Sequence, residues 1–86
     1  MTNYKNLRYT IAMNSSANPK SQKKFGDNLR EIRSSLQLSQ EEVAKASGIS
    51  VTYYAGIERG EENPTFAVIE NICKALKVKS GQVLPF

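Results

Sequence analysis

The segment formed by residues 40–60, QEEVAKASGISVTYYAGIERG, constrains the fold of this 86-residue chain more than any other feature. Val43 and Ala44 supply the apolar contacts of a first short helix. Gly48 tolerates the positive φ of a tight turn, and Ser50 can cap a second helix through its hydroxyl. The segment therefore predicts two short helices that cross at a tight turn.

Apolar spacing predicts a longer helix before this segment and also locates the start of the segment itself. The apolar residues of the longer helix recur at spacings of four, three and four: Phe25, Leu29, Ile32 and Leu36. Ser39 followed by Glu42 is a capping-box pattern, so the next helix is expected to start at Gln40. The second short helix is expected to run from about Val51 to Arg59 and to stop at Gly60.

Two more helical segments are expected towards the C-terminus. Thr65 can cap a fourth helix, whose apolar stripe consists of Phe66, Ile69, Ile72, Cys73 and Leu76. Ser80 can cap a last short turn, which carries Val83, Leu84 and Phe86. Since the connections are short and no repeat is present, the predicted fold is all-α, a compact bundle of four to five helices.

The N-terminal part differs in charge from the rest. Residues 1–24 hold five basic and no acidic side chains, whereas residues 25–86 hold seven basic and eight acidic ones. We therefore expect residues 1–24 to form a flexible basic arm and linker, and residues 25–86 to form the folded domain. Three lysines of the linker suit the DNA backbone or a minor groove, or simply solvent: Lys20, Lys23 and Lys24. The apolar residues of positions 7–13 alternate, which also suits a short strand: Leu7, Tyr9, Ile11 and Met13. Met13 is an alternative natural start of the protein.

Composition argues against an enzyme and against a metal site. The chain has no histidine and one cysteine, Cys73, so neither a Cys–His pair nor a set of about four zinc ligands can form. An internal disulfide is excluded as well, which suits a reducing compartment. No apolar run reaches the roughly 18 residues of a membrane span, and no signal peptide is recognisable. We expect a cytoplasmic, non-enzymatic protein that needs no cofactor, with Cys73 in its core.

Two short helices crossing at a glycine-containing turn form a helix-turn-helix, whose second helix can enter a DNA major groove. The sequence resembles the Cro-like, lambda-repressor-like family, also called the Xre family, over residues 25–80. The resemblance rests on Arg33, Leu38-Ser39-Gln40-Glu41-Glu42-Val43-Ala44, Gly48-Ile49-Ser50, Tyr53, Ile57-Glu58-Arg59-Gly60 and Asn63-Pro64-Thr65. Within the family, Tyr53 with Gly56-Ile57-Glu58-Arg59 and the short chain resemble restriction-modification controller proteins.

The resemblance implies contacts with base edges from the outer face of the second short helix, formed by Val51, Thr52, Ala55 and Gly56. Only Thr52 can hydrogen-bond a base, whereas Val51 and Ala55 can touch a thymine methyl group. Gly56 costs about 1 kcal/mol relative to alanine inside a helix, which a close approach to DNA would explain. We expect thin direct readout, supplemented by DNA shape; alternatively, Val51 marks a surface that does not bind DNA.

Contacts with the DNA backbone are implied for six residues: Gln40, Ser50, Tyr53, Arg59, Asn63 and Thr65. A phosphate is favoured beside Gln40 at the helix N-terminus, and Arg59 would neutralise another phosphate. Tyr53 and Tyr54 project about 100° apart, so Tyr54 is expected inside and Tyr53 partly outside. Glu61 and Glu62 in the same loop oppose close contact with phosphate.

The resemblance also implies an internal ion pair and a homodimer. Arg33 and Glu58 would pair and fix the second short helix. Apolar residues near the C-terminus exceed the needs of one small core and are the expected dimer surface: Val68, Val78, Val83, Leu84 and Phe86.

The implied function is regulation of transcription by a homodimer that binds a pseudo-palindromic operator in double-stranded DNA. Control by the protein's own concentration is expected, without a small-molecule effector. A controller of restriction–modification genes fits this logic. The alternatives are a phage-type repressor and an antitoxin-like protein-interaction module.

Overall fold

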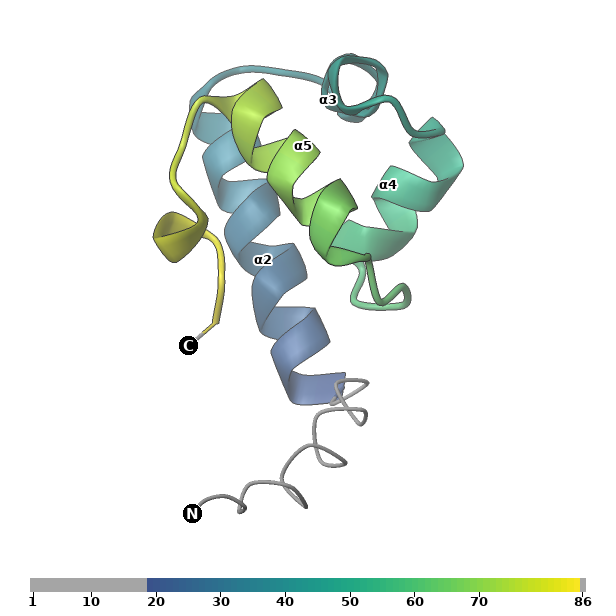
Figure 1. The fold of residues 1–86 in the computed structure, drawn as a ribbon, viewed down its shortest axis with the longest axis vertical. Coiled ribbons are helices and arrows are strands. Elements are labelled where there is room, and N and C mark those ends of the chain that lie inside the picture. The colour runs from purple at the N-terminus through teal and green to yellow at the C-terminus, as the bar shows by residue number, and fades with distance from the viewer. Residues whose placement is uncertain (1–18, 86) are drawn as a thin grey trace.

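Within residues 19–85, four α-helices and one 3-10 turn follow one another along the chain. The computed structural model describes residues 19–85. The elements are α2 (Pro19–Ser35), α3 (Gln40–Ser47), α4 (Val51–Glu58), α5 (Phe66–Leu76) and the 3-10 turn η1 (Ser80–Gln82) (Figure 1). The described residues contain no strand, which confirms the predicted all-α class. The expectations for Leu7, Tyr9, Ile11, Met13 and Phe86 fall outside the described residues.

Local capping signals set the starts of α3, α4 and α5. The Ser39 hydroxyl accepts a hydrogen bond from the Glu42 amide at 3.0 Å, and the Glu42 carboxylate accepts one from the Ser39 amide at 2.8 Å. Ser50 and Thr65 cap the next two helices in the same manner, each accepting from the amide three residues on. Gly48 has φ +76° at the turn. The predicted capping box, both caps and the glycine turn are therefore confirmed.

Three expected boundaries need correction. Helix α2 begins at Pro19 and not near Phe25, because proline suits the first helical turn and no breaker separates it from Phe25. The same helix ends at Ser35, so Leu36 lies beyond it and is 47% exposed. At the C-terminus, Lys79 occupies the cap position and Ser80 is the first residue of η1.

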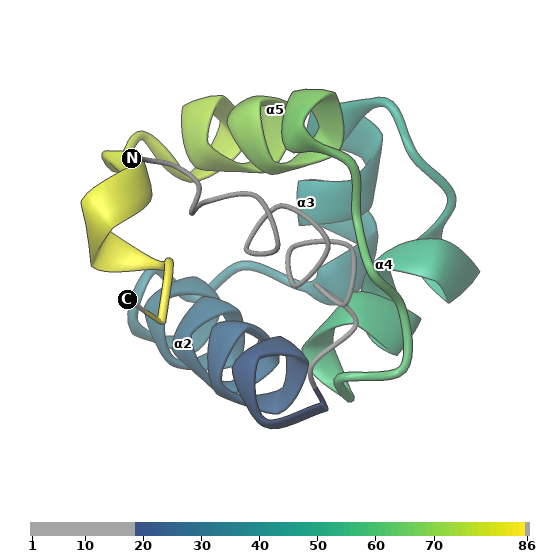
Figure 2. The same cartoon turned by 60° about the horizontal axis from the view of Figure 1, so that its bottom comes forward.

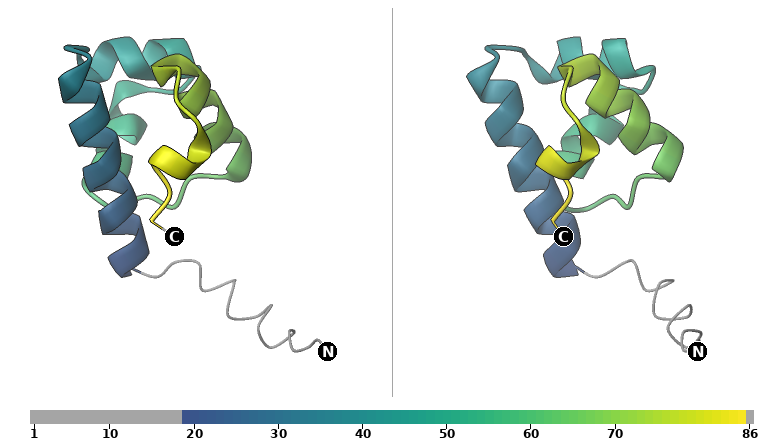
Figure 3. Two further views of the ribbon diagram at one scale, coloured as in Figure 1. Left: turned by 90° about the vertical axis from the view of Figure 1, so that its left-hand side faces the viewer. Right: turned by 60° about the vertical axis from the view of Figure 1, so that its left-hand side comes forward.

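The core lies where the four helices meet. Its fully buried members come from every helix and from the C-terminal segment, and include Leu29, Val43, Tyr54, Ile57, Ile72 and Val83. Seen from below, α2 and α5 lie on opposite sides, while α4 and the C-terminal turn lie at opposite ends (Figure 2). The segment that contains η1 runs between α2 and α5 (Figure 3). It is tied to α2 because the Asn28 amide group donates to the Val83 carbonyl at 2.9 Å.

Helix α2 approaches the end of α4 very closely at a glycine. A Cβ atom on Gly26 would lie 2.4 Å from the Glu58 carbonyl oxygen and 2.5 Å from that of Ile57. Real Cβ atoms do not approach backbone so closely, so only glycine fits here. Gly26 thus sets the position of α4 against α2. The sequence signal for it is a glycine inside an apolar helical repeat, which usually has a packing reason.

Candidate functional site: the outer face of α4

Helix α4 has a buried side and an open side. Tyr54, Ile57 and Glu58 are fully buried and anchor the helix. On the open side, Val51 and Thr52 are exposed and Ala55 is half-buried. These three residues form a small surface that we call the reading face. It offers two apolar side chains and one hydroxyl, the composition expected from the sequence.

Gly56 does not belong to the reading face, because it is buried. A Cβ atom at this position would lie 2.8 Å from Cγ of Glu62. The side chain of Glu62 therefore lies along the flank of α4 and takes the space that a side chain at position 56 would need. In the structure, the Glu62 side chain therefore covers Gly56, and a close approach of DNA to this glycine stays a prediction.

Ser50 and Tyr53 lie at the start of α4. The Ser50 hydroxyl accepts a hydrogen bond from the Tyr53 amide at 3.1 Å, so its role in the structure is to cap the helix. Tyr53 is half-buried and packs on the edge of the core. Tyr54 is fully buried, so the expected division between the two tyrosines is found.

Arg33 and Glu58 meet beneath α4 as the sequence implied. Arg33 Nε donates to Glu58 Oε2 at 2.6 Å and Arg33 Nη2 donates to Glu58 Oε1 at 3.0 Å, a bidentate pair. The third guanidinium nitrogen, Nη1, donates to the Leu38 carbonyl at 2.9 Å. The carboxylate is fully buried, and Arg30 Nε lies 3.7 Å from it. The Glu58 carboxylate of α4 is thus bonded to Arg33 of α2, and Arg33 in turn binds the Leu38 carbonyl in the connection before α3.

Gln40 joins this cluster and is not directed towards solvent. Its Nε2 donates to Glu58 Oε1 at 2.9 Å and its side chain is half-buried. Its amide group therefore links α3 to α4, and the contact of Gln40 with a DNA phosphate stays a prediction. The sequence placed Gln40 at the start of α3 but held no signal for a partner 18 residues away.

The cluster shifts the titration of its members. Burial alone would raise the pKa of Glu58, but hydrogen bonds from Arg33 and Gln40 outweigh it and hold the pKa below its ordinary value. Burial raises the pKa of the Tyr54 phenol, and the neighbouring Glu58 carboxylate raises it further. Glu58 is therefore ionised at neutral pH and Tyr54 is neutral. The cluster serves to hold α4 in place.

Arg59 lies at the end of α4, next to the reading face. Its Nη2 lies 2.9 Å from Glu61 Oε1, and both side chains are largely exposed. The hydrogen bond from Arg59 lowers the pKa of Glu61. The predicted phosphate-binding cation thus already has a carboxylate partner.

The other predicted backbone contacts surround the loop after α4. The Thr65 hydroxyl accepts from the Val68 amide at 3.1 Å and so caps α5. Asn63 is exposed on this loop.

Lys23 packs its backbone against Gly60, where a Cβ atom would lie 2.9 Å from Lys23 Cα. Its ammonium pairs with Asp27 one turn along α2. Lys23 therefore belongs to a helix beside the α4 loop and not to a linker.

Apolar side chains also gather in two surface clefts. One cleft, of about 280 Å³, lies along α5 and is lined by residues that include Phe66, Ile69, Val78 and Leu84. Phe66 is 82% exposed, which corrects its assignment to the core stripe. The residue sits in the first turn of α5, one position past its cap. We call this surface the α5 cleft.

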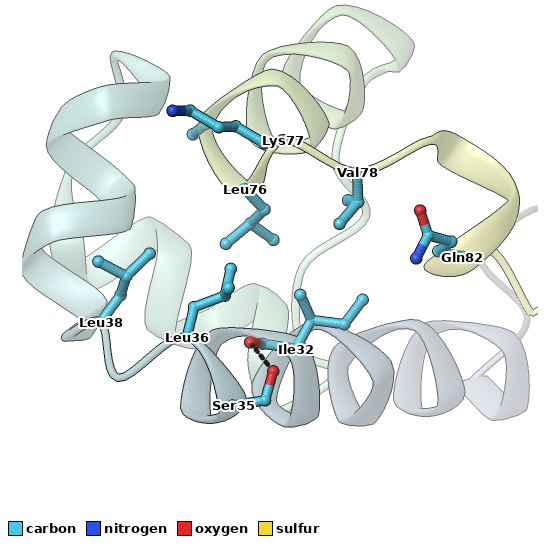
Figure 4. A pocket seen from close by; sticks show the side chains of 9 residues that line it. Ile32, Ser35, Leu36, Leu38, Leu76, Lys77, Val78 and Gln82 are labelled. Carbon is cyan, nitrogen blue, oxygen red and sulfur yellow. Dashed lines mark hydrogen bonds between the residues drawn. The ribbon is translucent and has the colours of Figure 1, made fainter.

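The second cleft, of about 620 Å³, lies between the ends of α2 and α5. Ile32, Leu36 and Leu38 point into it from one side, and Leu76 and Val78 from the other (Figure 4). We call it the α2 cleft. Both clefts share Val78, because this residue joins α5 to η1.

The residues predicted for a dimer surface divide between surface and core. Val68, Val78 and Leu84 are half-buried and remain available. Val83 is fully buried and belongs to the core of a single chain, because the C-terminal segment folds back over the helices. Cys73 is also in the core, where burial raises the pKa of its thiol.

Residues 19–85 contain no group of three or more potential metal-ligating side chains. Among these residues, none of the helices has both the length and the apolar character to cross a membrane.

Comparison with known proteins agrees with this geometry. The family model described as helix-turn-helix matches residues 29–83. Control protein C.BamHI of Bacillus amyloliquefaciens is 41% identical over 63 residues, 72% of this chain and 78% of that protein. Control protein C.SmaI of Serratia marcescens is 36% identical over 60 residues, 70% of this chain and 71% of that protein.

The fold is also similar to a solved structure. The restriction-modification controller protein C.AhdI from Aeromonas hydrophila superimposes with a TM-score of 0.72 at 36% identity, covering 73% of this chain and 96% of that one. The helix-turn-helix family model covers α3, α4 and α5 in full and the C-terminal part of α2 from Leu29 onwards. The chain belongs to the helix-turn-helix family and is a DNA-binding regulator of transcription.

Proposed function

We propose that the chain acts as a homodimer that places α4 in the major groove of each half of a pseudo-palindromic operator. The observation that carries this proposal is the open side of α4, where Val51, Thr52 and Ala55 stand free while the Arg33–Glu58 cluster holds the opposite side. An α-helix that is rigidly supported from behind fits the width of the major groove. Half-sites should then lie about one helical turn apart.

The backbone contacts of this proposal flank the reading face. Gln40 and Ser50 stand at the starts of α3 and α4, whose free amides suit phosphate oxygens. Arg59, Asn63 and Thr65 follow the other end of α4. Tyr53 is half-buried and can offer its hydroxyl at the edge. These contacts would position the helix, whereas the reading face would supply sequence preference.

The α5 cleft is the proposed dimer surface. It combines the exposed ring of Phe66 with the half-buried Ile69 and Leu84, and water is a poor partner for such a surface. A second copy of the same cleft would cover it symmetrically.

We expect Phe66→Ser to shift the protein from dimer to monomer in sedimentation. The matched control is Leu36→Ser, which changes an exposed apolar side chain in the α2 cleft. This variant should remain dimeric.

The regulated genes are proposed to be those of a restriction–modification system, including the gene of the regulator itself. Support comes from the similarity to control proteins and to a restriction-modification controller. No separate effector is needed, because dimerisation makes DNA binding depend on the protein's concentration. Acting on DNA, the protein is expected to work in the cytoplasm.

The experiment that tests the proposal is selection of bound sites from a random DNA pool, followed by titration of the best site. We expect a palindromic site, one dimer per site, and an affinity that falls steeply with salt. Thr52→Ala should weaken binding by about two- to tenfold, the value of one hydrogen bond. Asn71→Ala, an exposed change on α5, is the control and should leave binding unchanged. Failure to enrich any site would contradict the proposal.

A protein-interaction module is the second candidate, and the α2 cleft is the observation that favours it. This cleft exposes Leu36 and is separate from the reading face. The two functions are distinguished by variants. Thr52→Ala and Arg59→Gln would impair DNA binding only, whereas Leu36→Ser would impair capture of a protein partner only.

A further inference from the structure

Arg59 is the single basic residue of α4 and of the loops on either side of it. Between Gly48 and Thr65 no other lysine or arginine occurs, while Glu61 and Glu62 follow Arg59 within three positions. Within residues 48–65, any phosphate contact made by a side-chain charge therefore depends on one guanidinium. That guanidinium is 2.9 Å from a carboxylate oxygen of Glu61.

The backbone holds Glu61 in this position. Gly60 has φ +78°, the Gly60 amide donates to the Ile57 carbonyl at 3.0 Å, and the Glu61 amide donates to the Gly56 carbonyl at 2.9 Å. These two bonds form the Schellman motif that commonly ends helices. The turn brings the backbone of residue 61 back to the last turn of α4, which places the exposed Glu61 side chain within reach of Arg59.

Glu62 is kept on the same side of the loop. Its Cγ lies 2.8 Å from the position that a Cβ atom of residue 56 would take, against the flank of α4. Both carboxylates thus lie beside the helix, and neither is turned away from it. A phosphate bound at Arg59 would lie near the Glu61 carboxylate, whose oxygen is 2.9 Å from the guanidinium.

We propose that Glu61 is a specificity-determining residue that competes with DNA phosphate for Arg59. The inference rests on the proposed function. Non-specific binding consists almost entirely of contacts between basic side chains and phosphates. A carboxylate already paired with Arg59 removes such a contact from every non-specific complex. At the operator, base contacts fix the geometry, and the exposed, salt-screened pair is weak enough to be exchanged for a phosphate.

The test is Glu61→Gln in the full chain, with binding measured on the selected operator and on a random duplex at several salt concentrations. The random duplex should be bound about threefold to tenfold more tightly, and the operator less affected, so the specificity ratio falls. The salt dependence on random DNA should steepen by up to about 0.9 per protomer, the value of one phosphate contact. The effect should vanish when Arg59→Gln is combined with it.

Glu62→Gln is the matched control, since it removes the same charge one residue away without touching the ion pair. Equal effects of the two variants would show a general charge effect and overturn the inference. Unchanged binding of random DNA by Glu61→Gln would also overturn it. Wild-type protein that binds no DNA at all would instead remove the proposed function, so the two failures are distinguishable.

Discussion

At the scale of single residues, Glu58 has the largest structural effect. Its carboxylate is fully buried and accepts hydrogen bonds from Arg33 and Gln40. Removing one partner of a buried pair leaves the other charge without compensation. The position of α4, and with it the reading face, therefore depends in part on a side chain that is fully buried.

Glu58→Gln should lower the free energy of unfolding by about 3–5 kcal/mol at pH 7. The wild-type pKa of Glu58 is lower in the folded state than in the unfolded state, so its contribution is complete above about pH 4.3. The contribution is lost as the pH falls through the folded pKa. Urea unfolding at pH 7, 5, 4 and 3 should show this acid loss in the wild type.

The acid loss should be shallower in Glu58→Gln, which has no carboxylate to protonate at this position. Glu61→Gln is the control, because its ion pair is exposed and should leave the acid profile close to that of the wild type. Parallel profiles for the wild type and Glu58→Gln would contradict the assignment.

Replacement by alanine should change the stability of the protein differently at two glycines inside helices. Gly26→Ala would place a Cβ against the backbone of Ile57 and Glu58, and should cost about 1–3 kcal/mol. Gly56→Ala would meet only the flexible side chain of Glu62, and the helix gains about 1 kcal/mol from alanine. Thermal unfolding of both variants measures the difference. A larger loss for Gly56→Ala than for Gly26→Ala would contradict the packing described.

At the scale of helices, caps decide where each element begins. The reciprocal bonds between Ser39 and Glu42 satisfy two backbone N–H donors at the start of α3. This start also positions Gln40 for its bond to Glu58. A weakened cap therefore affects both the helix and the cluster beneath α4.

Ser39→Ala should lower the free energy of unfolding by about 1 kcal/mol. Ser34→Ala, an exposed change in the last turn of α2, should have no destabilising effect, because alanine is the better helix former. Chemical unfolding of the two variants makes the comparison. Equal stability of both would show that the capping box contributes nothing.

The same local signals explain how much was predictable from the sequence. Ser39, Gly48, Ser50 and Thr65 act on backbone groups a few residues away, so their roles follow from the sequence alone. The partner of Gln40 and the cover over Gly56 depend on residues brought together only by folding. Phe66 has the spacing of a core residue, but its place in the first turn of α5 leaves it outside.

At the scale of the whole molecule, folding and assembly use neighbouring residues of the C-terminal segment. Val83 is fully buried and its carbonyl accepts from Asn28 of α2. Leu84 is half-buried and lines the α5 cleft. One residue thus faces the core and the next faces the proposed dimer surface.

Val83→Ala should lower the stability of the single chain by about 2 kcal/mol. Leu84→Ala should instead raise the dimer dissociation constant and leave the stability of the monomer nearly unchanged. Unfolding at low protein concentration and sedimentation equilibrium separate the two quantities. Dimer loss in Val83→Ala at full stability would contradict this division.

The apolar reading face has a consequence for chemically modified DNA. Val51 and Ala55 can recognise a methyl group but cannot tell which base carries it, and Thr52 alone adds a hydrogen bond. Deoxyuridine in place of a contacted thymidine should weaken binding. Cytosine methylated at C5 projects a methyl group from the equivalent ring position and should restore part of the lost binding affinity. Occupancy of the operator would then depend on the methylation state of the genome as well as on its sequence.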